Sequence, residues 1–186
     1  MNNISLYTLL ILLYLGLTKS FSPSEKRAPF LADEKVADYL FAGAPISIIL
    51  EERFHVGFLI KTYYLKLKIV QPFKRPQNII VRTNATYWKG LDQKIGMSLY
   101  RRRDEGKPIN VLTTPPGFVF IGNRSYGDWK LSPSGSKKWR FFRVYRHLPR
   151  QLNWKDWRPS IHFYNKGLET IESGSDYVGG THSFGP

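Results

Sequence analysis

Basic and aromatic side chains crowd into one segment of the chain, residues 137–158. Lysine and arginine neutralise phosphates, arginine forks clamp phosphate or carboxylate through paired hydrogen bonds, and aromatic faces stack on bases or sugars. We therefore expect this segment to hold an anionic partner. The anion-binding candidates are Lys137, Lys138, Arg140, Arg143, Arg146, Arg150 and Arg158, the stacking candidates are Trp139, Tyr145 and Trp154, and Arg124 and Lys130 are placed at the rim.

A second interpretation fits the same residues. Successive side chains of a strand point to opposite faces, so the aromatic residues could enter the core while the basic residues are merely solvated. The segment contains no recognisable nucleic-acid-binding motif. The pattern indicates an anion without specifying which one.

The charge of the whole chain supports an anionic partner. The 186 residues contain 28 Lys and Arg against 14 Asp and Glu. The excess is concentrated between Arg101 and Arg158, where 14 basic residues face 4 acidic ones. A field of one sign attracts polyanions and anionic membrane surfaces. We expect the partner to be an anionic polymer or an anionic membrane surface, with another envelope protein as a further possibility.

A hydrolytic site is the alternative chemistry. A small secreted hydrolase, such as a nuclease, needs a general acid and base, and an arginine could stabilise the developing oxyanion. His147 or His162 with Asp128 or Asp156 supplies the required residue types, but no spacing selects these four residues. Asp128 and Asp156 could equally form ion pairs with nearby Lys or Arg.

Metal and cofactor chemistry have little support in the sequence. The chain has no cysteine, which excludes disulfides, a thiol nucleophile and cysteine-ligated metals. Its histidines form neither H-x-H nor H-E-x-x-H, the spacings that bring two imidazoles to one metal. We expect no metal site and no cofactor.

The N-terminus carries an almost unbroken apolar run from Ile4 to Leu17 without Asp or Glu. As a helix these 14 residues would extend about 21 Å, less than the roughly 30 Å hydrocarbon core of a bilayer. Signal peptides have apolar regions of about 7–15 residues, so we expect a signal peptide over residues 1–20 that is cut after Ser20. An uncleaved anchor and an ordinary buried helix are the alternatives. The protein is then exported to the periplasm or the extracellular space.

The remaining chain divides into a linker (21–32), one domain (33–172) and a flexible tail (173–186). Apolar residues spaced by three and four predict a helix from Asp33 to about Ala42 and another from Asn84 or Thr86 to about Arg103. Alternation predicts an antiparallel strand over 61–70, with Leu65 and Leu67 on one face and Lys66 and Lys68 on the other. Further strands are expected at 46–50, 78–83, 109–112 and 118–121.

Two aromatic-rich runs, 126–131 and 137–145, flank a Ser/Pro/Gly loop and predict a β-hairpin. Phe141, Val144, Tyr145 and Leu148 also fit a helical face, but their β-propensity favours the hairpin. The expected fold is α+β, a mainly antiparallel sheet with one or two packing helices. The sequence predicts a basic, non-catalytic binding protein of the envelope or extracellular space, with a hydrolase or a membrane-anchored component of an envelope complex as alternatives.

Overall fold

A four-stranded antiparallel sheet forms the centre of the protein. The computed structural model describes residues 3–20, 28–58, 60–133 and 135–178. The strands follow the order β3-β2-β1-β4, and a separate hairpin pairs β5 with β6. The strands are β1 (Ile46–Val56), β2 (Thr62–Val70), β3 (Gln77–Thr83), β4 (Ser98–Arg102), β5 (Gly127–Leu131) and β6 (Lys137–Phe141).

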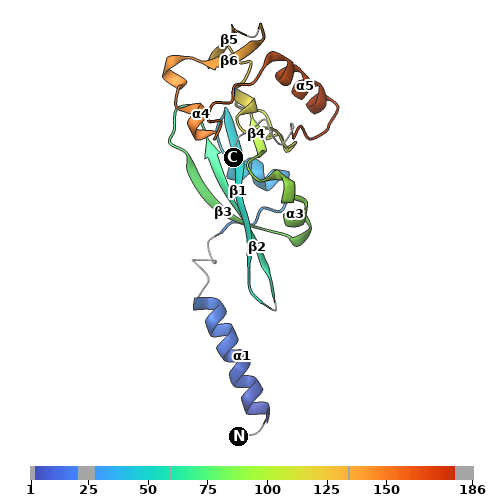
Figure 1. Cartoon of the computed structure of the whole chain (residues 1–186). Helices are drawn as coiled ribbons and strands as arrows, with labels where there is room; N and C mark the ends of the chain where they lie inside the picture. The colour runs from blue at the N-terminus through green and yellow to red at the C-terminus, as the bar shows by residue number, and fades with distance from the viewer. Residues whose placement is uncertain (1–2, 21–27, 59, 134, 179–186) are drawn as a thin grey trace.

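Five α-helices accompany these strands in the described residues, together with short 3-10 turns. The helices are α1 (Asn3–Ser20), α2 (Glu34–Leu40), α3 (Ala85–Gly90), α4 (Leu148–Gln151) and α5 (Ile161–Glu172). The 3-10 turns are η2 (Asp92–Lys94), η3 (Phe118–Phe120) and η4 (Arg143–Tyr145). The chain is therefore an α+β protein, as predicted. Figure 1 shows the β5–β6 hairpin, α4 and α5 gathered at one end of the sheet.

The sheet separates two hydrophobic clusters, because alternate residues of a strand face opposite sides. On one side, Ile46, Ile48 and Leu50 of β1 pack in a cluster that also contains residues of α2 and the inward face of β2. On the other side, Ile49 and Val70 meet η3, the hairpin and the loop around α4. Partly buried residues of α5 complete this second cluster. The second cluster supports the segment that carries the candidate site.

The local patterns that were clearest in the sequence are confirmed. Asp33 caps α2 by accepting a 3.0 Å hydrogen bond from the Val36 N–H. In β2, Leu65 and Leu67 are fully buried whereas Lys66 and Lys68 are partly exposed. The expected hairpin is present, with Trp129 opposite Trp139, but its second strand ends at Phe141 and residues 143–145 form η4 instead. These elements follow from short-range residue periods, so the sequence alone was sufficient to find them.

Three predictions about local structure are wrong, and one helix was not predicted. No strand forms over the described residues 109–112, where Asn110 makes only an isolated bridge with Arg101. The helix expected up to Arg103 ends at Gly90, and after η2 the chain turns at Gly96, whose φ of +83° lies in the left-handed region, to enter β4. The strand expected at 118–121 is the 3-10 turn η3. Helix α5 was not predicted, although Ser160 caps it by accepting a 3.2 Å hydrogen bond from the Phe163 N–H.

The folded domain extends beyond its expected boundaries of 33 and 172, since residues just outside both of them are packed against it. Leu31, expected in the linker, is buried and donates its N–H to the Arg82 carbonyl at 2.8 Å. Tyr177, expected in the tail, is buried and donates its N–H to the Thr113 carbonyl at 2.9 Å. The rest of the linker (21–27) and of the tail (179–186) lies outside the described residues.

Helix α1 contains the apolar run that predicted an export signal. The large apolar side chains described in it, from Ile4 to Leu17, are exposed. Among the described residues, no helix has the length and apolar character needed to cross a membrane. Export and cleavage after Ser20 stay predictions.

Candidate functional site

A tightly anchored loop between β6 and α5 carries most of the candidate site. Leu148 and Leu152, at the two ends of α4, are fully buried, as is Trp154 just beyond them. The Trp154 backbone N–H donates to the Pro149 carbonyl, and its indole N–H donates to the Pro116 carbonyl, both at 2.8 Å. These contacts hold the loop from within, so Arg150 and Lys155 stay on the outside, where both are exposed.

The two residues that flank Trp154 have an unusual backbone. Asn153 has a φ of 58° and Lys155 a φ of 48°, and they are the only non-glycine residues with positive φ among those described. The left-handed region costs an L-residue about 1–2 kcal/mol, although asparagine tolerates it better than most. Such strain often marks functional sites. Here it lets Trp154 point into the core while Asn153 and Lys155 both line a cavity.

That cavity has a volume of about 870 Å³ and is lined by both basic and apolar residues. Its basic lining residues all come from the segment between η4 and α5, and they are Arg146, Arg150, Lys155 and Arg158. Its apolar lining residues come from that loop and from two distant segments, and they include Ile95, Met97, Pro116, Leu152 and Val178. Among the described residues that line it there is no aspartate or glutamate. We call this cavity the α4 pocket.

The four cations of the α4 pocket are not neutralised within the part of the chain that the structure describes. None of them forms an ion pair there with a carboxylate. Arg158 instead donates from Nη1 to the carbonyls of Lys155 and Trp157, at 3.0 and 2.7 Å. These hydrogen bonds orient the guanidinium without cancelling its charge. The pocket can therefore attract an anion electrostatically.

The predicted anion-binding residues divide between two places. Arg146, Arg150 and Arg158 line the α4 pocket. Lys137, Lys138 and Arg140 are exposed on β6, and Arg143 is exposed in η4; none of these four lines the pocket. The backbone N–H of Trp139 donates a 2.8 Å hydrogen bond to the Pro159 carbonyl, which holds β6 beside the segment that carries Arg158. The basic residues therefore gather only in part.

The stacking role predicted for Trp139, Tyr145 and Trp154 has to be corrected. Trp139 is 1% exposed, Trp154 is not exposed at all, and Tyr145 is buried. Trp154 stacks on Phe141 with 5.3 Å between ring centroids, and Tyr145 makes an edge contact with Tyr126 at 5.2 Å. Strand alternation turns Trp139 inward, and the anchored loop does the same for Trp154. Their ring faces are occupied by the core and offer no surface for a ligand.

The structure does not pair the candidate catalytic histidines with the candidate carboxylates. His147 donates from Nε2 to the Pro72 carbonyl at 3.0 Å, since a carbonyl oxygen can only accept. Asp128 pairs with Lys130 at 3.2 Å, and the hydrogen bond from that lysine, with one from the Trp129 N–H, lowers the pKa of the carboxyl. Asp156 and His162 are exposed. Within the described ranges, no hydrogen bond or ion pair joins a histidine to a carboxylate.

The described residues contain no group of three or more His, Asp or Glu side chains that could hold a metal ion.

Some lining residues of the α4 pocket were not predicted from the sequence. They are Lys155, Val178 and four residues of the segment before β4: Gln93, Ile95, Gly96 and Met97. Lys155 lay within the basic segment, and its neighbour Asn153 could have suggested a left-handed turn. No local signal connects Ile95 or Met97 to Arg150, because tertiary folding alone brings them together.

Comparison with known proteins adds nothing to this geometry: no family model, curated protein or solved structure matches the chain.

Proposed function

We propose that the protein is an exported, non-catalytic binding protein that holds an anionic polymer at the α4 pocket. The observation that carries the proposal is the convergence of Arg146, Arg150, Lys155 and Arg158 on one cavity without an acidic neighbour in its lining. Each cation that meets a phosphate, sulfate or carboxylate of the polymer releases a counterion, which makes binding favourable at low salt.

The shape of the site supports a polymer more than a membrane. The cations line a hollow of about 870 Å³, into which one charged unit of a chain can enter. A flat bilayer surface makes its best contact with a flat or protruding basic face.

The direct test is binding to polyphosphate and to heparin over a range of salt concentrations. In the double variant Arg146→Gln/Arg150→Gln, we expect the slope of log K against log salt to fall by about 1.4–1.8, since each contact contributes about 0.7–0.9. The matched control is Lys137→Gln/Lys138→Gln, which removes the same charge from β6, outside the pocket. Its slope should change by less than half as much.

Two results would overturn the proposal. Equal losses in the two double variants would mean that the field of the whole chain, and not the α4 pocket, holds the polymer. Binding to vesicles with anionic lipids that is tighter than binding to polyphosphate would mean that the partner is a membrane surface.

Export has its own test. Expression in a host with a secretory pathway, followed by mass spectrometry of the mature protein, should give an N-terminus at Phe21. A chain that retains Met1 or Asn2 and sediments with membranes would support the uncleaved anchor instead.

A further inference from the structure

Two consecutive arginines at the end of β4 are almost entirely buried but have very different surroundings. Arg101 and Arg102 are each 8% exposed. As neighbours on a strand, their side chains leave opposite faces of the sheet. Arg102 donates a hydrogen bond to the Asp38 carbonyl of α2. Both arginines line a cavity together with Phe118 of η3 and Leu168 of α5.

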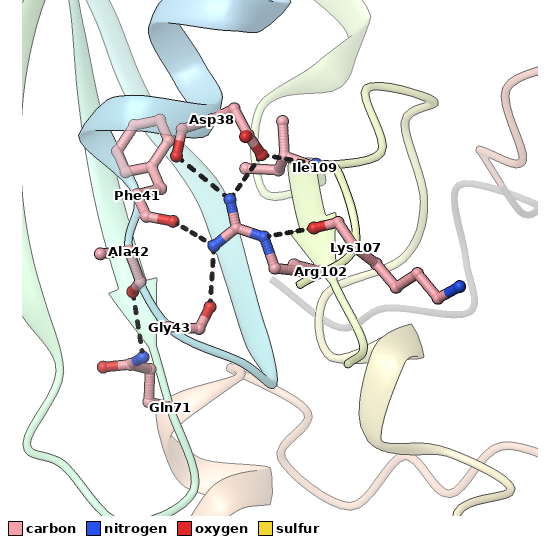
Figure 2. Close-up of polar contacts among 8 residues, drawn as sticks. All are labelled: Asp38, Phe41, Ala42, Gly43, Gln71, Arg102, Lys107 and Ile109. Atoms are coloured by element: carbon pink, nitrogen blue, oxygen red, sulfur yellow. Dashed lines mark hydrogen bonds and ion pairs between the residues drawn. The ribbon is translucent and has the colours of Figure 1, made fainter. Parts of the chain in front are cut away.

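Arg102 is saturated with hydrogen bonds, as Figure 2 shows. Its guanidinium donates to the carbonyls of Phe41, Gly43, Asp38 and Lys107 at 2.7 to 3.1 Å, and to the Asp38 carboxylate at 2.5 Å. Asp38 also accepts a 2.7 Å hydrogen bond from the Ile109 N–H. Arg102 therefore has both a counter-charge and acceptors, and its burial is explained by the fold.

Arg101 has far fewer polar partners than Arg102. Its side chain makes a single hydrogen bond within the described residues, from Nη1 to the Leu112 carbonyl at 2.5 Å, and no ion pair. Burial, and then the nearby charge of Arg103, lower the pKa of Arg101 to about 10, while Asp176 opposes this shift. Asp176 is itself held by Lys94 at 2.5 Å and by the Thr113 N–H at 2.7 Å. Nε and Nη2 of Arg101 donate to no acceptor among the described residues, and neither is one of the fully buried polar atoms left without a partner, so both keep some contact with solvent.

The cavity beside Arg101 combines charge with apolar surface. Its volume is about 360 Å³, at the small end of the range of about 300–1,000 Å³ for small-molecule pockets. Arg103, Lys107 and the acidic Asp104 lie at its charged side. Its apolar side is formed by Phe118 and Val119 of η3 and by Leu168 and Ile171 of α5. We call it the β4 cavity; it shares no lining residue with the α4 pocket.

We propose that the β4 cavity binds a small organic carboxylate with an apolar body. The planar carboxylate would accept hydrogen bonds from Nε and Nη2 of Arg101 in the bidentate geometry that a guanidinium fork favours. The apolar body would pack against Phe118, Leu168 and Ile171. A bound carboxylate would pair directly with Arg101, which no carboxylate of the described residues does, and would offset the desolvation of the buried cation.

Benzoate is a suitable probe, and benzamide is its uncharged match in size and shape. Calorimetric titration of the full chain should give saturable benzoate binding with a Kd on the order of 1 mM or tighter, a modest value in keeping with so small a ligand. Benzamide should bind at least about tenfold more weakly, because it lacks the charge that strengthens the hydrogen bonds. Inorganic phosphate, which has no apolar body, should also bind more weakly. Equal binding of benzoate and benzamide would overturn the proposal.

Two variants test the place of binding. Arg101→Lys keeps the charge but removes the fork, and should weaken benzoate binding about tenfold. If this variant does not fold, as judged by thermal unfolding, Ile171→Trp fills the cavity from α5 without a change of charge and should abolish benzoate binding. Unchanged affinity in a folded variant of either kind would rule out the β4 cavity.

The Arg146→Gln/Arg150→Gln variant separates this proposal from the proposed function. It should bind benzoate with wild-type affinity while losing affinity for polyphosphate. Added salt should weaken benzoate binding less than polyphosphate binding, because buried pairs are screened less than exposed ones. A chain that binds polyphosphate but not benzoate would refute the β4 cavity alone, and the reverse result would refute the α4 pocket alone.

Discussion

The indole N–H of Trp154 donates a 2.8 Å hydrogen bond to the carbonyl of Pro116, a residue 38 positions earlier in the chain. Both residues belong to the structure of the α4 pocket: Pro116 lines it, and Trp154 lies between its lining residues Asn153 and Lys155. The hydrogen bond therefore joins two walls of the pocket. It fixes the loop that carries the cations relative to Pro116, which comes from a separate segment.

Loss of this hydrogen bond should destabilise the protein measurably. Trp154→Phe keeps an aromatic ring in the core but leaves the Pro116 carbonyl without its donor, and should lower the free energy of unfolding by about 1–2 kcal/mol. Urea unfolding measures the change. Trp139→Phe is a matched control, because Trp139 is equally buried but its indole N–H has no acceptor among the described residues. Equal losses in the two variants would show that ring volume, and not the hydrogen bond, is responsible.

The left-handed backbone of Lys155 predicts a trade between stability and binding. Lys155→Gly removes the steric cost of a φ of 48° and should raise the free energy of unfolding by about 1 kcal/mol. The same change removes a cation from the α4 pocket, so polyphosphate affinity should fall at low salt.

Lys155→Asn is the matched control for this prediction. It also removes the charge but keeps a residue that tolerates the left-handed region, so it should weaken binding equally with a smaller gain in stability. A Lys155→Gly variant less stable than the wild type would mean that the side chain of Lys155 stabilises the loop by packing.

The sequence was informative wherever a short period in one segment decides the structure. Leu65 and Leu67 alternate with Lys66 and Lys68, and the strand they predict is β2. The long helix was wrongly predicted from four apolar residues at helical spacing, Trp88, Leu91, Ile95 and Leu99. The same spacing can arise across a short helix, a 3-10 turn and a strand. Gly96, in the left-handed region, separates these elements. Gly90 and Gly96, which both lie in the expected helix, already argued against one continuous helix in the sequence.

The candidate sites were harder to predict because they depend on which way side chains point after folding. The basic segment was recognised, but Trp139 and Trp154 proved to be core residues. Arg101 and Arg102 were expected at the end of a helix and are buried in β4 instead. No pattern within the segment distinguishes Arg102, which donates five hydrogen bonds, from Arg101, which donates one, since the partners lie up to 64 residues away.

The ion pair between Asp38 and Arg102 should make stability depend on pH. The hydrogen bond from Arg102, and then that from the Ile109 N–H, lower the pKa of Asp38 below its ordinary value of 3.8. The stabilisation is therefore complete above about pH 4 and is lost as the pH falls through the lower pKa of the folded state. Asp38→Asn should be less stable than the wild type at pH 7, and the difference should shrink towards pH 2.

Urea unfolding at several pH values checks this prediction. Asp156→Asn is the control, because Asp156 is exposed and makes no ion pair within the described residues. Its stability should follow that of the wild type over the whole range. A constant gap between Asp38→Asn and the wild type down to pH 2 would mean that packing or the Ile109 contact, and not the charge of Asp38, is what matters.

Arg101 and Arg102 should respond in opposite ways when each is replaced by methionine. Arg102→Met leaves the Asp38 carboxylate and several buried carbonyls without donors, and should lower the free energy of unfolding by about 3 kcal/mol or more. Arg101→Met removes a buried cation that has one hydrogen bond and no ion pair among the described residues. Its unfolding free energy should stay within about 1 kcal/mol of the wild type or increase, because apolar residues often replace poorly compensated buried charges without loss. A loss of about 3 kcal/mol in both variants would show that Arg101 is a structural residue, and the charge in the β4 cavity would then need no ligand to account for it.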